Sequence, residues 1–214
     1  MRILGARGVA LNGAGREAHM PEMFLRRLSR WQAEGQREAV ADLYADLYVD
    51  LCADASGGTG AGNGSGSGSG SGSGVRQDFL RRFEHDVQQT DFDMVVAHVA
   101  GNLVGCLYGY RAERGGEWWE SFRHVLSPAV VEQTASGRVF LLSEVMVAHP
   151  ERGSDVAYRM RTLLLTRHTS DVVVAVIRPD DDQGREVLQS WDWTKLGEFA
   201  PRQEGWLRPP SPMP

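Results

Sequence analysis

Apolar residues recur along this chain at two spacings, and the change from one to the other predicts the order of strands and helices. Short runs rich in β-branched residues and bounded by turn residues predict strands, and apolar residues three or four apart predict amphipathic helices. Strands are predicted over residues 23–28, 94–99, 103–110, 139–147, 172–177 and 193–199, and helices over 32–52, 79–87, 117–133, 156–168 and 183–190. The run 172–177 is apolar throughout, which is typical of a buried central strand. This order favours an α/β fold with one mixed sheet covered on both faces.

A Gly- and Ser-rich tract interrupts the pattern at residues 56–74. Such a tract has no side chains to bury and loses much entropy on ordering, so we expect a flexible loop, native or engineered. Only about 50 residues precede it, which is too few for an independent domain. We therefore expect a single domain over 22–200, a disordered or poorly ordered extension over 1–21, and a Pro-rich C-terminal tail over 201–214.

Charge, hydropathy and cysteine usage exclude several classes of partner. The formal net charge of −5 gives no basic face of the kind that nucleic-acid binders carry, so no nucleic-acid partner is expected. No segment approaches the ~20 apolar residues of a membrane-spanning helix, so no membrane is expected. Cys52 and Cys106 form neither a disulfide framework nor a zinc spacing. We expect a cytoplasmic protein with two reduced thiols.

The histidines give no reason to expect a metal site. His98, His124 and His168 are scattered along the chain without the spacing of metal ligands, and we assign them to the surface or the core. His149 follows a predicted strand and precedes Pro150, where a turn residue is a simpler interpretation than a catalytic base.

The junction over residues 143–157 carries the clearest chemistry. A strand that ends near Val147 runs into a tight polar turn, and the turn opens a helix at about Val156. This arrangement aims backbone N–H groups and a helix N-terminus at one point in space, which suits a pyrophosphate.

The junction resembles the acyl-coenzyme A loop of the GNAT N-acetyltransferase superfamily, whose pattern is Gln/Arg-x-x-Gly-x-Gly/Ala. Arg152 and Ala157 fit this pattern in register, while Asp155 stands at its middle glycine. The order of elements, the phrase over 102–106 and the closing segment over 178–198 are also similar to the family, and the first helices look most like those of uncharacterised actinobacterial members. The resemblance implies a GNAT-like fold that binds acetyl-coenzyme A through Val145, Val147, Arg152, Gly153, Ser154, Asp155, Val156 and Ala157.

The resemblance also implies a catalytic role for Glu144. In the family the strand over 140–147 splays from its neighbour and binds the pantetheine arm of the coenzyme as if the arm were another strand. Glu144 would then deprotonate the acceptor amine, directly or through water, and the N–H of Val147 would polarise the thioester carbonyl. The alternative is that Glu144 only caps or pairs at the sheet edge. Trp118 and Trp119 either line the acceptor cleft or belong to the core.

Four departures from the family pattern lie at these sites. A carboxylate at Asp155 would repel a pyrophosphate by about 1–3 kcal/mol, which weakens binding about tenfold to a hundredfold. Asp181 and Asp192 replace an asparagine and a glycine, and Leu188 replaces the tyrosine that protonates the leaving thiolate. We read residues 180–182 as a solvated turn in which Asp182 caps the helix that follows.

Two functions remain open at this point. The first is an acetyl-coenzyme A-dependent N-acetyltransferase that acts on an amine of a small molecule or a protein, for which the resemblance allows a homodimer. The second, favoured by the four departures, is a catalytically impaired GNAT-fold protein that binds a ligand or partner. An unrelated α/β binding domain is a third reading, which requires the order of elements to be coincidental.

Overall fold

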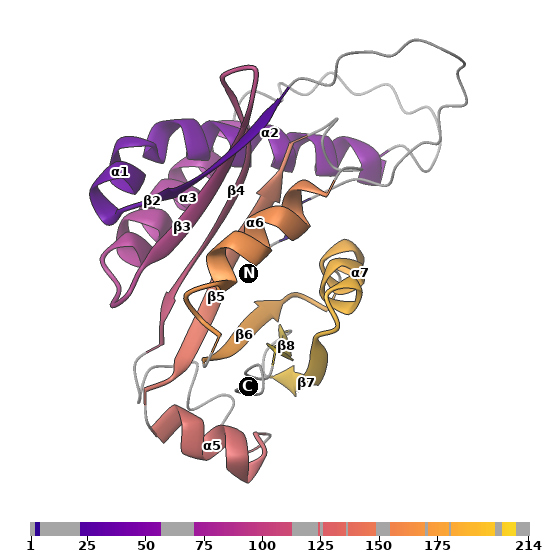
Figure 1. Ribbon diagram of the computed structural model, residues 1–214. Helices are drawn as coiled ribbons and strands as arrows, with labels where there is room; N and C mark the ends of the chain where they lie inside the picture. Colours follow the sequence, from indigo (N-terminus) through magenta and orange to yellow (C-terminus); the bar gives the residue numbers. More distant parts are fainter. Residues whose placement is uncertain are drawn as a thin grey trace, which may run out of the picture.

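The computed structural model of this protein is built around one mixed β-sheet (Figure 1). The structure describes residues 3–4, 22–56, 71–112, 124, 126–135, 137–148, 155–169, 171–179, 181–199 and 203–208. The strands are β1 (Ile3–Leu4), β2 (Met23–Leu28), β3 (Asp93–Val99), β4 (Asn102–Arg111), β5 (Val139–Val147), β6 (Val172–Ile177), β7 (Thr194–Phe199) and β8 (Gln203–Arg208). The helices are α1 (Arg30–Gly35), α2 (Arg37–Ser56), α3 (Ser71–Val87), α5 (Pro128–Ala135), α6 (Val156–Leu165) and α7 (Asp182–Ser190).

The sheet runs in the order β2-β3-β4-β5-β6-β8-β7, and β1 pairs with β5 outside this path. Two of its pairings are parallel, β5 with β6 and β1 with β5, and the others are antiparallel. β3 and β4, which were predicted as two successive strands, form a hairpin through Ala100 and Gly101, whose φ angles are +51° and +84°. Positive φ at both central residues is the geometry of the tight turn that matches the twist of paired strands.

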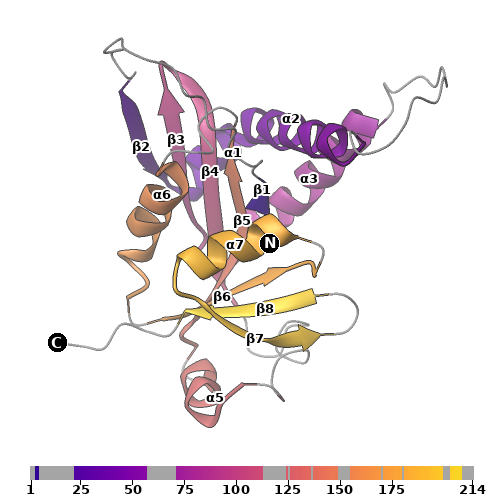
Figure 2. The same cartoon turned by 90° about the vertical axis from the view of Figure 1, so that its right-hand side faces the viewer.

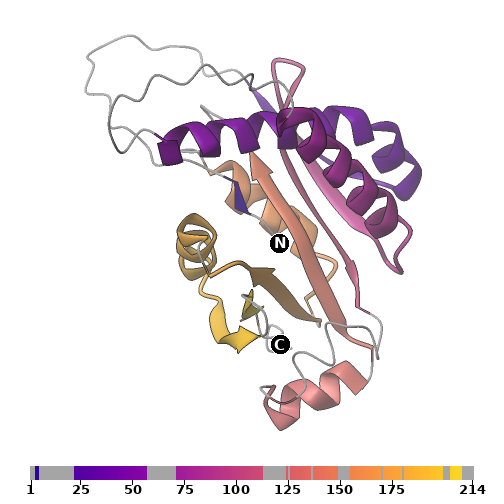
Figure 3. The same ribbon diagram turned by 180° about the vertical axis from the view of Figure 1, so that it is seen from behind.

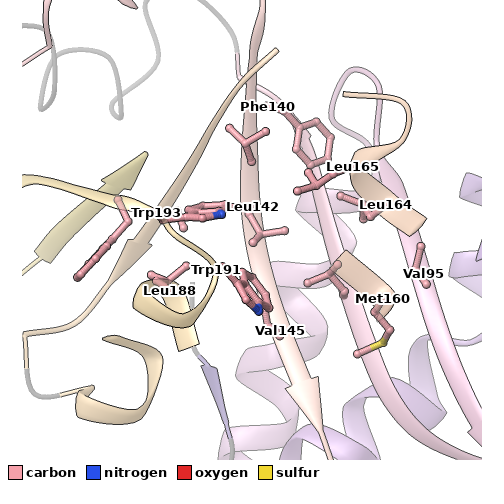
Figure 4. Packing of buried hydrophobic residues seen from close by; sticks show 14 of the residues in the cluster. Val95, Phe140, Leu142, Val145, Met160, Leu164, Leu165, Leu188, Trp191 and Trp193 are labelled. Atoms are coloured by element: carbon pink, nitrogen blue, oxygen red, sulfur yellow. The ribbon is translucent and has the colours of Figure 1, made fainter. Parts of the chain in front are cut away.

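Helices cover both faces of the sheet, as the pattern predicts. α6 packs on one face and α1 to α3 on the other, which the front and back views show (Figures 1 and 3). On the α6 face, Leu188 and Trp191 meet Leu142 and Val145 of β5 (Figure 4). Gly105 of β4 lets α6 approach closely, because an added Cβ would lie only 2.9 Å from the Met160 side chain.

A β-bulge in β5 sets the geometry on which the site depends. Tyr108 of β4 pairs with Glu144 and Gly109 with Leu142, so Ser143 is an extra residue in β5. The bulge shifts the alternation of side chains, so that both Ser143 and Glu144 face α3. The pairing of β5 with β6 covers Val139–Leu142 and ends at the same point.

The predicted elements are largely confirmed where the structure describes them, with two differences. The helix predicted over 117–133 is described only from Pro128, as α5, and residues 124, 126 and 127 before it are not helical. The segment predicted as one helix over 32–52 is two helices, α1 and α2, separated at Gln36. Ser29 starts α1 with a capping box, in which its side chain accepts from the N–H of Gln32 and the Gln32 side chain accepts from the N–H of Ser29. Gly35 then ends α1, and α2 begins at Arg37.

The predicted domain limits are wrong at three places. Residues 201–214 are not simply a tail, because 203–208 form β8 between β6 and β7. Residues 1–21 are not wholly an extension, because 3–4 form β1. The predicted loop over 56–74 overlaps helices at both ends, because Ser56 ends α2 and α3 begins at Ser71, and residues 57–70 lie outside the described residues.

β8 belongs to the sheet because its side chains are buried and paired. Trp206 and Leu207 pack into two of the core clusters. Glu204 is buried, and its carboxylate lies 3.2 Å from Arg185 Nη2 and 3.0 Å from Lys195 Nζ. Burial opposes ionisation of Glu204, but the hydrogen bonds from Arg185 and Lys195 outweigh it and lower its pKa. The strand predicted to close the fold, β7, is therefore the edge, and β8 lies inside it.

A buried polar network joins the turn after α6 to three strands. His168 Nδ1 lies 2.8 Å from Asp171 Oδ2, and His168 Nε2 lies 3.4 Å from Asp93 Oδ2. Arg27 of β2 pairs with Asp93 at 3.2 Å, and Arg111 of β4 pairs with Asp171 at 3.5 Å. Because His168, Asp93 and Asp171 are all buried, each depends on the others for polar contacts that water cannot supply.

We predict that a chain ending at Ala200 does not fold. The truncation removes β8, which leaves β6 and β7 without their common neighbour and removes the buried Trp206. Circular dichroism in a urea titration should show no cooperative transition for this chain. A chain ending at Pro209 keeps β8 and is the control, which should unfold cooperatively. A cooperative transition in the chain ending at Ala200 would contradict the placement of β8.

We predict that His168→Ala lowers the free energy of unfolding by about 2–4 kcal/mol, because it leaves two buried carboxylates without their shared partner. Urea unfolding of both proteins measures the difference. His98→Ala is the control, since His98 is half-buried on β3 and lies outside the network, and it should cost less than about 1 kcal/mol. Equal losses in the two variants would count against the network.

Candidate functional site

The strand and the helix of the predicted junction are present as β5 and α6. β5 ends at Val147, and α6 begins at Val156 with Asp155 at its N-cap. The Asp155 side chain is exposed and makes no capping hydrogen bond, while its carbonyl accepts from the N–H of Arg159 at 2.9 Å. Asp155 therefore stands at the helix entry with its carboxylate turned to solvent. His149 and the predicted coenzyme residues 152–154 lie outside the described residues.

The two residues that open α6 anchor the helix. Val156 is fully buried in the cluster beneath α6, and Ala157 packs against the same cluster. Their side chains thus hold the first turn of α6 on the sheet.

Val145 and Val147 place the end of β5 beside this junction. Their side chains are buried in the α6 cluster, and their backbone pairs with Leu107 and Gly105 of β4 on one side. On the other side, β6 has already diverged from β5 at Leu142, which Figure 2 lets the reader follow. Beyond Leu142, this second side of β5 pairs with the two-residue strand β1 and no longer with β6.

Glu144 lies at the opening but faces the α3 side of the sheet. Its side chain is only 2% exposed, and its Oε2 lies 4.0 Å from Nη1 of Arg82 on α3. Tyr108 is its partner across the β4–β5 pairing. Burial raises the pKa of Tyr108 well above its ordinary value, and the carboxylate of Glu144 raises it further, so the phenol stays protonated.

A hollow of about 400 Å³ lies between α3 and β5, and Glu144 is in its wall. Its lining residues are polar or charged: Arg81, Arg82, His85, Asp86, Ser143 and Glu144. Asp86 is buried and accepts a hydrogen bond from the Ser143 hydroxyl at 2.8 Å. Burial raises the pKa of Asp86, although the Ser143 hydrogen bond opposes that rise. Two carboxylates therefore face one hollow, together with the guanidinium groups of Arg81 and Arg82.

A second hollow of about 430 Å³ shares Arg81 and Arg82 with the first. Its other lining residues are Tyr44, Tyr48, Val75 and Asp78. The Arg82 guanidinium lies 5.3 Å from the ring centre of Tyr44 and 5.8 Å from that of Phe79. Burial opposes the charge of Arg82, but Glu144 and neighbouring tyrosines outweigh it and raise the pKa of Arg82. Arg82 thus stays charged beside Glu144.

The α7 side of the opening holds the other three departures from the family pattern. Leu188 is fully buried in the cluster with Trp191 and Trp193, so no ionisable group stands there (Figure 4). Asp192 has a φ of +58°, the left-handed conformation that glycine adopts most easily. The N-cap of α7 is Asp181, not the predicted Asp182, because Asp181 Oδ1 accepts from the N–H of Gly184 at 2.7 Å.

The remaining chemical candidates do not add to the site. Within the described ranges, no group of His, Cys, Asp and Glu is arranged to hold a metal ion. Cys106 is a buried free cysteine, and burial raises its pKa well above the ordinary value, so it stays a thiol. None of the helices described here has the length and apolarity to span a membrane. Trp118 and Trp119 lie outside the described residues.

Sequence reasoning missed Arg82, Asp86 and Ser143. On the sequence, Arg82 and Asp86 read as ordinary exposed residues of a helix, four positions apart. A signal for Ser143 was present, because Ser143 and Glu144 are two consecutive polar residues in an apolar strand. Such a pair breaks the alternation of a regular strand and is the mark of a bulge.

Comparison with known proteins identifies the fold but no close relative. No family model and no curated protein sequence matches the chain. An acetyltransferase from Thermus thermophilus superposes with a TM-score of 0.53 at 10% identity, over 89% of this chain and 99% of that one. The PaiA N-acetyltransferase from Thermoplasma acidophilum, in complex with coenzyme A, gives 0.57 at 8% identity, over 88% and 99%. An aminoglycoside 6′-acetyltransferase type Ii gives 0.55 at 11%, over 89% and 99%. The fold of this chain is therefore that of the GNAT acyl-coenzyme A N-acyltransferases, a single mixed α/β domain.

Proposed function

We propose that this protein is an acetyl-coenzyme A-dependent N-acetyltransferase in which Glu144 is the general base for an amine acceptor. The observation that carries the proposal is the position of Glu144. It is a carboxylate, 2% exposed, in the wall of the hollow between α3 and β5, at the bulge where β5 leaves β6. A buried carboxylate at the open point of the sheet can take a proton from a substrate that enters the hollow.

The residues around the opening fit the coenzyme in part. The side of β5 past Leu142 can pair with an extended amide chain, as the pantetheine arm is, through the backbone of Val145 and Val147. The entry of α6, with Arg152, Gly153 and Ser154 before Asp155, would hold the pyrophosphate. When bound, acetyl-coenzyme A supplies an activated acetyl group as a thioester. The exposed Asp155 carboxylate works against this fit.

The side chains of the hollow support an amine acceptor. Under this proposal Asp86 and Glu144 accept hydrogen bonds from the amine, and Glu144 accepts its proton so that the neutral nitrogen becomes the nucleophile. Leu188 can donate no proton, so the leaving thiolate must take its proton from another group or from water. The acceptor is a small molecule or a protein amine. A cytoplasmic location and a homodimer are parts of the same proposal.

The alternative function is a GNAT-fold protein that binds a ligand without turnover. Two observations favour it, the buried Leu188 where the family acid would stand and the Arg82 guanidinium 4.0 Å from Glu144. An arginine this close competes with a substrate amine for the carboxylate of Glu144. Activity measurements separate the two functions.

We predict that Glu144→Gln lowers kcat by about 10²–10⁴-fold, because the amide cannot accept the proton of the amine. Release of free coenzyme A thiol from acetyl-coenzyme A is measured against a panel of diamines, aminoglycosides and peptides with free amines. Glu84→Gln is the matched control, since Glu84 is exposed on α3 and lines neither hollow. A native protein that binds acetyl-coenzyme A and acetylates no amine on the panel would favour the binding function.

We predict that Asp155→Gly and Asp155→Asn each tighten acetyl-coenzyme A binding about tenfold or more, because each removes a like charge from the pyrophosphate site. The fold should tolerate both changes, since the Asp155 side chain caps nothing. Titration calorimetry measures the Kd. Asp46→Asn, on the exposed face of α2, makes the same change of charge elsewhere and should leave the Kd unchanged. Unchanged affinity in both Asp155 variants would place the pyrophosphate elsewhere.

A further inference from the structure

The N-terminal strand β1 lies on the side of β5 that faces the opening of the sheet. Ile3 pairs with Val145 and Leu4 with Met146, in parallel. β4 occupies the other side of these residues, where Leu107 pairs with Val145 and Cys106 with Met146. β1 therefore uses the side that β6 leaves at Leu142. Figure 2 shows β1 at this place, and β1 also contacts α7 and α2.

This side of β5 can hold one extended segment at a time. Paired strands lie about 4.7–4.9 Å apart, and each backbone group of the pairing edge takes one partner in that direction. An edge of this kind accepts a strand through main-chain hydrogen bonds and needs little side-chain recognition. Any other extended amide chain that binds Val145 and Met146 from this side must first displace Ile3 and Leu4.

We propose that β1 competes with the pantetheine arm of acetyl-coenzyme A for the open edge of β5, so that the N-terminus of the chain inhibits coenzyme binding. The inference rests on the proposed function, which assigns the arm to the same edge. Its basis in the structure is the register of β1 on Val145 and Met146, together with the end of the β6 pairing at Leu142. The occupant is a segment of this chain, held near its site by the connection to β2.

The length of β1 suits a segment that leaves its site. β1 has only two residues, whereas β6 pairs with β5 through four, from Val139 to Leu142. A two-residue pairing is opened at much smaller cost than the core strands. If β1 occupies the edge in about nine molecules of ten, the apparent Kd of the coenzyme is about tenfold weaker than that of the open form.

Removal of β1 tests this competition. Deletion of residues 2–4 removes the strand, and Leu4→Pro removes a backbone N–H and restricts the residue before it. Both variants should bind acetyl-coenzyme A about tenfold more tightly than the native chain, measured by titration calorimetry on the full protein. Leu11→Pro is the matched control, because it makes the same change outside β1, and it should leave the Kd unchanged.

A nucleotide without the arm separates competition at β5 from other effects of the variants. Adenosine 3′-phosphate 5′-diphosphate lacks the pantetheine arm, so its Kd should be the same in the native chain and in both variants. Desulfo-coenzyme A keeps the arm and should follow acetyl-coenzyme A. A synthetic peptide of residues 1–8, added to the deletion variant, should weaken acetyl-coenzyme A binding and leave nucleotide binding unchanged.

Each other outcome overturns the inference in a recognisable way. If acetyl-coenzyme A binds the native chain and both variants equally, β1 does not compete, and the proposed function stands. If acetyl-coenzyme A binds none of them while all unfold cooperatively, the proposed function fails and the inference with it. If the nucleotide tightens as much as the coenzyme, β1 does not act at the arm. If neither variant unfolds cooperatively, β1 is needed for folding and cannot leave β5 to admit a ligand.

Discussion

The structure depends on the point in β5 where backbone pairing changes. Up to Leu142, β5 is a central strand with partners on both sides. At Ser143 the bulge adds one residue, and from there β6 no longer follows. This bulge turns the Glu144 side chain toward α3. Beyond the bulge, one side of β5 is no longer paired with β6, and the strand continues toward the entry of α6. If the regular pairing continued past Leu142 without a bulge, Glu144 would pair with Leu107 and meet the apolar cluster under α6.

The buried carboxylate of Glu144 affects the ionisation of the groups around it. Glu144 shares its surroundings with Tyr108 and Cys106, whose pKa values it raises in addition to the effect of burial. Both groups stay neutral, so Arg82 is the nearby charge that offsets the carboxylate. Because Arg82 is half-exposed and stacks on Tyr44, an entering substrate can contact it. The Arg82 guanidinium can therefore exchange its contact with Glu144 for a contact with a ligand in the hollow.

The sequence allowed the regular parts of the fold to be predicted, because long periodic segments carry their own signal. Segments 139–147 and 172–177 were predicted with the limits that β5 and β6 have. β1 was missed because two residues have no period. β8 was missed because Glu204 and Gly205 interrupt its apolar pattern and prolines follow it, and only the pairing with Arg185 and Lys195 makes Glu204 compatible with burial. Glu144 became a candidate through a resemblance to a known family. Arg82 and Asp86 could be recognised only in the structure, where α3 packs beside β5.

Three features around the end of β5 bear on the proposed coenzyme site. Under the proposed function, Asp155 at the entry of α6 and β1 on the edge of β5 would both oppose binding of the coenzyme, and Leu188 would leave no acid beside its reacting end. The acceptor side keeps two carboxylates in a hollow of about 400 Å³. If the proposed function holds, these three features act on the donor, while Glu144 and Asp86 remain on the acceptor side. Such a division would favour control of coenzyme access over a general loss of function. In such a protein, the strand β1 would set the affinity for acetyl-coenzyme A by its competition for the edge of β5.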